Sequence, residues 1–216
     1  MSETVIQVTS LGKRIKGKTI LEDISFEINQ GDCVALIGPN GAGKTVLMSC
    51  ILGDKKPSSG QVLIDGKAGK AKNKIAVLLQ ENTIPNSLKV EELIAFFQSI
   101  SDNPLTNQEV QELLQFKEDQ YQQFADKLSG GQRRLLAFVL CLIDKPNILF
   151  LDEPTAGMDT STRQRFWEIV NDLKKSGVTI LYSSHYIEEV EHTADRILVL
   201  HQGKLIRDTT PYAMRH

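Results

Sequence analysis

A glycine-rich stretch constrains this chain more than any other feature of its sequence. Residues 38–45 read Gly-Pro-Asn-Gly-Ala-Gly-Lys-Thr and fit the pattern G-x-x-x-x-G-K-[ST]. They follow the apolar run Val34–Ile37, so the pattern predicts a buried strand, then a loop, then a helix. Glycines let successive backbone N–H groups point inward, and a helix N-terminus adds partial positive charge. The stretch therefore predicts a site for the phosphates of a nucleoside triphosphate.

Each residue type in this stretch suits that chemistry. Lys44 brings a full positive charge to the phosphates, and Thr45 offers a hydroxyl oxygen to Mg²⁺. The alternative, a glycine turn with an incidental lysine, is disfavoured by the strand and helix flanks. The candidate nucleotide-binding residues here are Gly38, Pro39, Asn40, Gly41, Ala42, Gly43, Lys44, Thr45 and Val46.

A pair of carboxylates follows a second buried strand. Ile148–Leu151 is an unbroken apolar run, typical of a strand buried on both faces of a parallel sheet, and Asp152 and Glu153 come directly after it. Such sheets expose ligand-binding groups at the carboxyl ends of their strands. We expect Asp152 to hold Mg²⁺ through water and Glu153 to act as the general base or to orient the attacking water. The alternative, two solvated acids before a turn, is disfavoured by the preceding apolar run.

The rest of the chain alternates strands with helices around one helical insertion. Apolar runs with β-branched residues predict strands over Val5–Val8, Ile20–Ile28, Gln61–Ile64, Ile75–Leu79, Val178–Ser183 and Arg196–His201. Helical spacing predicts helices over Val46–Leu52, Arg133–Ile143, Thr160–Lys175 and Tyr186–His192. Between Ser87 and Ala125 the spacing is helical throughout, with a capping box at Thr106–Glu109. This alternation predicts an α/β fold with a mainly parallel sheet, in one domain over residues 1–216.

Charge and hydropathy limit the classes of partner. The formal net charge is −2, so no global basic field favours nucleic acid. The longest nearly apolar run, Leu135–Ile143, is far shorter than the roughly 20 residues of a membrane-spanning helix. Residues 1–4 lack the pattern of a signal peptide. Cys33, Cys50 and Cys141 are widely spaced without C-x-x-C and lie among apolar neighbours, which predicts buried free thiols in a reducing cytoplasm.

One local basic segment stands apart from this balance. Lys67, Lys70, Lys72 and Lys74 occur in a stretch without acidic residues. Such a segment could bind RNA, an anionic lipid surface or an acidic partner. A solvated loop is the simpler interpretation.

Three motifs together resemble the ATP-binding-cassette (ABC) family. Residues 38–45 are similar to its Walker A motif, Leu128–Gln132 reads Leu-Ser-Gly-Gly-Gln like its signature sequence, and Ile148–Glu153 resembles its Walker B motif. Their order along the chain also matches, and the resemblance spans essentially the whole sequence. It implies a P-loop NTPase core with a mainly parallel sheet, an N-terminal antiparallel β sub-domain and an inserted α-helical sub-domain at about residues 87–127.

The resemblance also implies roles for residues outside the phosphate loop. Gln80 matches the Q-loop glutamine that contacts Mg²⁺ or the attacking water, and His185 matches the switch histidine at the γ-phosphate. Asp159 matches the D-loop aspartate that couples two sites across a dimer, although an aspartate before a helix is a good N-cap in any fold. In such a dimer Ser129 and Gly131 would contact the γ-phosphate bound to the other subunit. The candidate signature residues are Ser129, Gly130, Gly131 and Gln132.

We therefore expect an ATP-hydrolysing subunit of a multi-chain membrane transporter. The residues from Ser184 to Leu205 are similar to single-cassette, exporter-type subunits. The expected partners are separate transmembrane permease subunits and a second nucleotide-binding subunit, either a copy of this chain or a paralogue. The expected location is the cytoplasmic, inner face of the cell membrane, with no nucleic-acid partner. The alternatives are a soluble regulatory or nucleic-acid-associated cassette, which only the basic segment supports, and a P-loop kinase, which the signature sequence disfavours.

Ile15 departs from the family pattern and generates a prediction about nucleotide affinity. The family usually has an aromatic residue upstream of Walker A that stacks on adenine, and Ile15 occupies the matching position. Ile15→Tyr is expected to tighten ATP binding, because stacking of a base on an aromatic ring contributes about 1–3 kcal/mol. Calorimetric titration with ATP measures the change. An unchanged affinity would remove the idea that Ile15 gives weaker nucleotide affinity, or weaker base selectivity, than an aromatic residue at this position.

Overall fold

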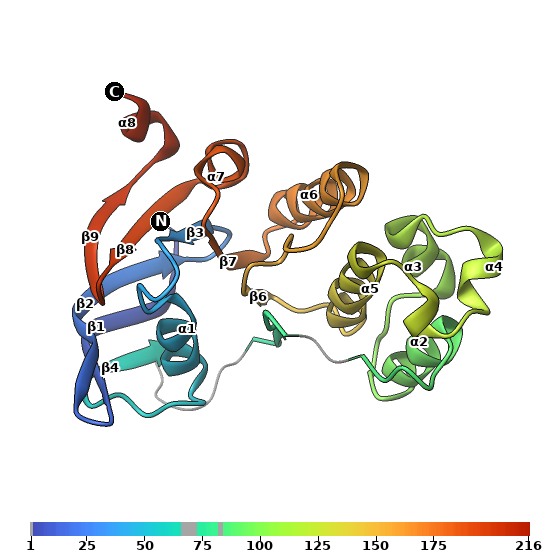
Figure 1. The fold of residues 1–216 in the computed structure, drawn as a ribbon, viewed down its shortest axis with the longest axis horizontal. Coiled ribbons are helices and arrows are strands. Elements are labelled where there is room, and N and C mark those ends of the chain that lie inside the picture. Colours follow the sequence, from blue (N-terminus) through green and yellow to red (C-terminus); the bar gives the residue numbers. More distant parts are fainter. Residues whose placement is uncertain (1, 66–72, 82–83) are drawn as a thin grey trace.

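The computed structural model describes residues 2–65, 73–81 and 84–216, and Figure 1 shows its ribbon. Within these residues there are two sheets. One has three antiparallel strands in the order β2-β1-β4, and the other has six strands in the order β5-β6-β7-β3-β8-β9. No helix in the described ranges is both long enough and apolar enough to cross a membrane.

The elements follow one another in an alternating order along the chain. The three-stranded sheet consists of β1 (Thr4–Ile15), β2 (Lys18–Asn29) and β4 (Ser59–Ile64). The six-stranded sheet consists of β3 (Cys33–Ile37), β5 (Ile75–Leu78), β6 (Ile148–Leu151), β7 (Thr179–Ser184), β8 (Arg196–His201) and β9 (Lys204–Thr209). The helices are α1 (Lys44–Leu52), α2 (Val90–Ser99), α3 (Asn107–Leu114), α4 (Glu118–Tyr121), η1 (Ala125–Lys127), α5 (Gly130–Leu142), α6 (Thr160–Lys175), α7 (Ile187–Thr193) and α8 (Pro211–Arg215).

The register of the six-stranded sheet brings the ends of four strands to one edge. All neighbouring strands in it are parallel except β8 and β9. Leu78 pairs with Leu151, and Leu151 with Tyr182. Ile37 pairs with Ser184. The loops after β3, β5, β6 and β7 therefore leave the sheet side by side. The predictions of a mainly parallel α/β sheet and of an antiparallel β sub-domain are confirmed.

The central strands of this sheet, β6, β7 and β3, are buried on both faces and divide their side chains between two cores. In β3, Ala35 and Ile37 belong to the core that also contains residues of α5 and α6. Val34 and Leu36 face the other core, which α1, β1 and β2 complete. Successive side chains of a strand point to opposite faces, so an unbroken apolar run supplies both cores. This explains why β3 and β6 are entirely apolar.

The helical insertion lies at the far end of the molecule from the three-stranded sheet. In Figure 1, α2, α3 and α4 gather beyond α5, which separates them from the strands. The predicted capping box begins α3: Thr106 Oγ1 accepts from the Glu109 N–H at 3.2 Å, and a Glu109 carboxylate oxygen accepts from the Thr106 N–H at 3.1 Å.

Two regions of strand extend beyond the prediction. β1 continues past Val8 to Ile15, where it pairs with Lys18 in a hairpin with β2. β9 was not predicted, because its largely exposed residues show no apolar run. It is stabilised by antiparallel pairing with β8, in which His201 pairs with Lys204. In both cases pairing with a neighbouring strand decides the conformation of a polar segment. The short α8 was not predicted either.

Two helices begin earlier than predicted. α5 begins at Gly130, because the Ser129 side chain caps it. α1 begins at Lys44 rather than Val46, so the last residues of the phosphate loop belong to the helix. Both differences place motif residues in a helical first turn, where backbone N–H groups have no intrahelical partner.

The basic segment and the cysteines can be placed only in part. Lys67, Lys70 and Lys72 lie outside the described residues. Lys74 lies within them, and its Nζ is 3.2 Å from Asp144 Oδ1. The predicted burial is confirmed for Cys33 and Cys50, whereas Cys141 is partly exposed; all three are free thiols.

Candidate functional site

The phosphate loop joins β3 to α1 and ends at the helix N-terminus. Gly41 and Gly43 have φ angles of 82° and 101°, in the left-handed region that favours glycine. A Cβ at Gly43 would also lie 2.8 Å from the Leu21 Cδ2 atom. Gly43 caps α1 without a side-chain hydrogen bond. The N–H groups of the first turn are thus left for a ligand, and a helix N-terminus attracts anions.

Lys44 is buried at the start of α1, with a side chain that is 6% exposed. Its ammonium donates to the carbonyls of Gly38 and Pro39, the latter at 3.5 Å, and lies 3.8 Å from Glu153 Oε1. Burial lowers the pKa of Lys44 from its ordinary value, and the carboxylates of Glu153 and Asp152 oppose this effect. The Lys44 ammonium therefore already points toward the loop on which a phosphate would bind.

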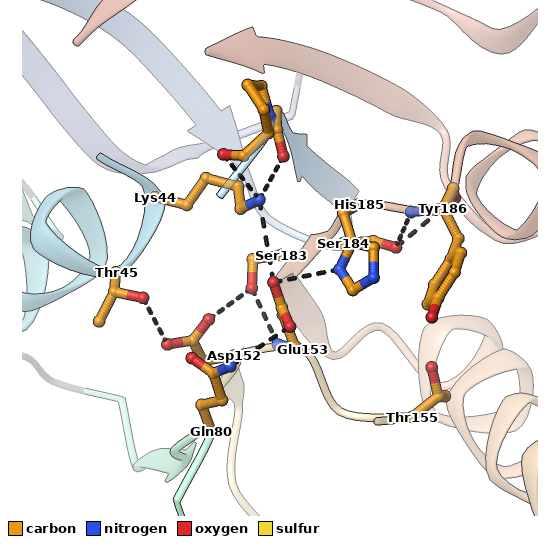
Figure 2. Close-up of polar contacts among 12 residues, drawn as sticks. Lys44, Thr45, Gln80, Asp152, Glu153, Thr155, Ser183, Ser184, His185 and Tyr186 are labelled. Atoms are coloured by element: carbon orange, nitrogen blue, oxygen red, sulfur yellow. Dashed lines mark hydrogen bonds and ion pairs between the residues drawn. The ribbon is translucent and has the colours of Figure 1, made fainter. Parts of the chain in front are cut away.

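Asp152 is held by hydroxyl groups on both sides of its carboxylate (Figure 2). Thr45 Oγ1 donates to Asp152 Oδ2 at 3.0 Å. Ser183 Oγ donates to Asp152 Oδ1 at 2.6 Å and accepts from the Glu153 N–H at 2.8 Å. The carboxyl end of β6 is therefore tied to α1 on one side and to β7 on the other.

Glu153 lies where three other predicted site residues meet. Its Oε1 is 3.3 Å from His185 Nδ1 and 3.8 Å from Lys44 Nζ, and its Oε2 accepts from Gln80 Nε2 at 3.4 Å. Figure 2 shows these side chains converging from the start of α1 and from separate loops. The φ angle of Glu153 is 44°, a left-handed conformation that costs a non-glycine residue about 1–3 kcal/mol. Such strain persists only where surrounding contacts hold it, and it gathers at functional sites.

His185 reaches this group from the loop after β7. Its ring packs against Tyr186, with centroids 4.0 Å apart. Ser184 Oγ accepts from the Tyr186 N–H at 3.0 Å, which shapes the turn before α7. The His185 side chain remains 36% exposed, so it can meet a ligand as well as Glu153.

The signature residues lie at the start of α5 and take no part in the hydrogen bonds of the phosphate loop described above. Ser129 Oγ accepts from the Gln132 N–H at 3.1 Å, and the Gln132 side chain accepts from the Ser129 N–H at 3.2 Å. A Cβ at Gly131 would lie 3.2 Å from Met158 Cα, so the signature and the loop before α6 are in close contact. In the described ranges, no hydrogen bond or ion pair links the signature residues to residues 38–45.

Among the described residues, no hydrogen bond or ion pair links Asp159 or Ile15 to the phosphate loop either. Asp159 caps α6: its Oδ1 accepts from the Thr162 N–H at 2.8 Å, and the hydrogen bonds from Thr162 lower the pKa of Asp159. Ile15 ends β1 and is half-buried. Within one chain, these two positions have the roles of a helix cap and a hairpin residue.

Sequence reasoning missed two polar residues that hold the carboxylates. Ser183 bonds Asp152 and Glu153 as described above. Arg134 is 8% exposed and donates from Nη2 to the Asp152 carbonyl at 3.0 Å. Ser183 ends a buried apolar run beside the Walker B strand, and Arg134 interrupts the apolar face of a helix. The serine at the end of a buried run and the arginine within an apolar helix face were the sequence signals that could have indicated these two residues.

The donor atoms of this site suit Mg²⁺ that arrives with a nucleotide. Thr45 and Asp152 offer neighbouring oxygens, the ligand type that this hard cation takes. In the part of the chain that the structure describes, no group of three or more His, Cys, Asp or Glu residues could hold a metal ion. Mg²⁺ in nucleotide sites is usually bound by one or two carboxylates together with phosphates, so the site fits it.

Comparisons with known proteins show which family this chain resembles. The family described as ABC transporter matches residues 21–156. Nod factor export ATP-binding protein I of Burkholderia orbicola (strain AU 1054) is 33% identical, over 99% of this chain and 73% of that protein. Linearmycin resistance ATP-binding protein LnrL of Bacillus subtilis (strain 168) is 34% identical, over 94% of this chain and 68% of that protein. A solved ATP-binding subunit of an ABC transporter has a TM-score of 0.84 at 26% identity, covering 98% of this chain and 92% of that one.

Ser183 provides a stability test of this arrangement. Ser183→Ala removes a donor from the Asp152 carboxylate and an acceptor from the Glu153 N–H, both in a buried setting. The free energy of unfolding is expected to fall by about 1–3 kcal/mol. Urea unfolding at neutral pH measures it. Ser176→Ala is the matched control, because that hydroxyl is exposed and, among the described residues, bonds only the Leu173 carbonyl. Equal, small effects of the two substitutions would contradict the role given to Ser183.

Proposed function

This chain belongs to the ABC transporter family, and from that premise we propose that it is the ATP-hydrolysing subunit of an exporter. Its transmembrane subunits would be separate chains, and it would lie on the cytoplasmic face of the cell membrane. The names of the relatives, which refer to Nod factor export and to linearmycin resistance, support the direction of transport. The observation that carries the proposal is the placement of Glu153 among Lys44, Gln80 and His185.

ATP would bind with its phosphates on the loop of residues 38–45 and on the first turn of α1, as far as Val46. Lys44 would exchange the carbonyls of Gly38 and Pro39 for phosphate oxygens and offset their negative charge. Ile15 would cover one face of the adenine.

Mg²⁺ would be held by Thr45, Asp152 and Gln80, and when bound it supplies positive charge that neutralises the phosphates. Ser183 keeps the Asp152 carboxylate in place from the opposite side. Thr45 and Asp152 need not move far to hold the ion, because hydrogen bonds already fix both side chains without a nucleotide.

Hydrolysis would be promoted by Glu153. Its carboxylate orients the attacking water and accepts a proton from it as the water oxygen bonds to the γ-phosphorus. The bond from the γ-phosphorus to its bridging oxygen breaks, which gives ADP and phosphate. His185, whose imidazole lies beside Glu153 Oε1, would contact the γ-phosphate, and Gln80 would contact the water.

A second cassette would complete each site. Ser129, Gly130, Gly131 and Gln132 form the N-terminus of a helix that ends at Leu142, long enough for its first-turn amides to attract an anion. Within one chain this end has no phosphate to contact. In a dimer it would contact the γ-phosphate on the partner's phosphate loop, and Asp159 would lie between the two sites.

The helices of residues 87–127 would form the sub-domain that contacts the transmembrane subunit. Large apolar side chains are exposed on and around it: Phe96 is 55% exposed, Ile100 65% and Phe124 45%. Leu79, next to Gln80, is 51% exposed. Exposed apolar side chains of this size support a protein contact, and Gln80 would connect it to the site.

Glu153→Gln tests the function directly. The variant is expected to bind ATP and to form an ATP-dependent dimer, while its turnover falls by about 10²–10⁴-fold because the general base is lost. Steady-state phosphate release and size-exclusion chromatography measure these quantities. Glu168→Gln, the same change at a half-exposed position of α6, should leave turnover unchanged. Full turnover by Glu153→Gln would discard Glu153 as the key carboxylate.

A further inference from the structure

Arg134 is a buried cation whose hydrogen bonds within the described residues all go to backbone carbonyls. Its Nη2 donates to the carbonyls of Asp152 at 3.0 Å and Glu153 at 3.4 Å. Its Nε donates to the Pro154 carbonyl at 3.3 Å, and its Nη1 donates to the Leu79 carbonyl. Arg134 belongs to α5 and lies in the turn of that helix that follows the signature sequence. One guanidinium therefore contacts two loops of the site.

The two loops carry the groups that meet at the attacking water. Leu79 directly precedes Gln80, and the other carbonyls belong to the turn that carries Asp152 and Glu153. A guanidinium presents several N–H donors in a rigid planar arrangement, so it fixes the positions of its acceptors relative to one another. The backbone contacts made by Arg134 thus set the spacing between Gln80 and Glu153, whose side chains are 3.4 Å apart.

The turn at Glu153 needs such support. Its φ angle of 44° is unfavourable for a side-chain-bearing residue, and three successive carbonyls of this turn point toward Arg134. Burial lowers the pKa of Arg134, and the charges of Asp152, Cys141 and Glu153 oppose that effect. An apolar residue in place of Arg134 would remove this donor from all these carbonyls, of which only that of Glu153 has a further described donor, the Ala156 N–H, and would remove a positive charge beside the carboxylates.

We propose that Arg134 is a positioning residue for ATP hydrolysis: it holds the backbones of Gln80 and Glu153 where their side chains meet at the attacking water. This inference rests on the proposed function of the same site. It differs from a packing role, because the carbonyl contacts act on the carboxylate turn and the Q-loop while the phosphate loop has none of them. Catalysis should therefore suffer more than the affinity for nucleotide measured without Mg²⁺, because Asp152 and Gln80 are also the proposed Mg²⁺ ligands.

Arg134→Met, Arg134→Lys and Arg133→Met together test the proposal. Arg134→Met keeps an unbranched side chain and loses every donor, so kcat is expected to fall about 10–100-fold, with the affinity for a fluorescent ATP analogue measured without Mg²⁺ within about threefold. Arg134→Lys keeps the charge and part of the hydrogen bonding, and it should recover part of the lost kcat. Arg133→Met is the matched control: its neighbouring guanidinium donates to Asn86 Oδ1 at 2.6 Å, and kcat should stay within about twofold.

The outcomes separate positioning from general stability. A fall in kcat at unchanged affinity, with partial recovery in Arg134→Lys, supports the proposal. If Arg134→Met does not fold, as judged by circular dichroism, a selective kcat loss in Arg134→Lys supports it alone. Normal kcat in a folded Arg134→Met, or parallel losses of kcat and affinity, would overturn it. ATP hydrolysis by the unsubstituted chain, abolished in Glu153→Gln, decides the proposed function separately.

Discussion

The contact between the first turn of α1 and the carboxyl end of β6 is the interaction on which the site depends. Thr45 Oγ1 lies 3.0 Å from Asp152 Oδ2, and Lys44 Nζ lies 3.8 Å from Glu153 Oε1. The strand order makes this contact possible, because β7 separates β3 from β6 and all three end at one edge of the sheet. Ser183 of the middle strand then bonds the carboxylate turn directly. The layout of the site thus follows from parallel strand pairing.

Two cations and two carboxylates are buried together at this edge. Lys44, Arg134, Asp152 and Glu153 are each less than a tenth exposed. Burying such charges without partners would cost several kcal/mol each, and here carbonyls, hydroxyls and opposite charges offset that cost. In the proposed function, Lys44 would exchange its carbonyls for phosphate oxygens, whereas Arg134 would keep its carbonyls. Lys44 would then bind the substrate, and Arg134 would hold the shape of the site.

The parts of the fold and of the site that could be predicted are those whose sequence signal lies within one short segment of the chain. The phosphate loop and the carboxylate pair were predicted because each directly follows an apolar run, and a buried strand of a parallel sheet needs apolar residues on both faces. Ser183 and Arg134 were missed because their partners come from strand pairing and from the packing of α5, which no short pattern encodes. The strand β9 was missed because its polar residues are held by β8. The role proposed for Ser129 would require a second chain, so the resemblance to a family, and not the fold of one chain, indicated it.

In the proposed function, each ATP site is built from residues of two chains. Steady-state ATP hydrolysis by Lys44→Ala chains, by Ser129→Arg chains and by their mixture tests it most directly. Each variant alone is expected to be inactive, because every site in its dimers is defective. Mixed dimers contain one intact site, so an equimolar mixture should recover roughly a quarter of the unsubstituted activity if chains exchange freely. Full activity of the Ser129→Arg chain by itself would contradict the claim.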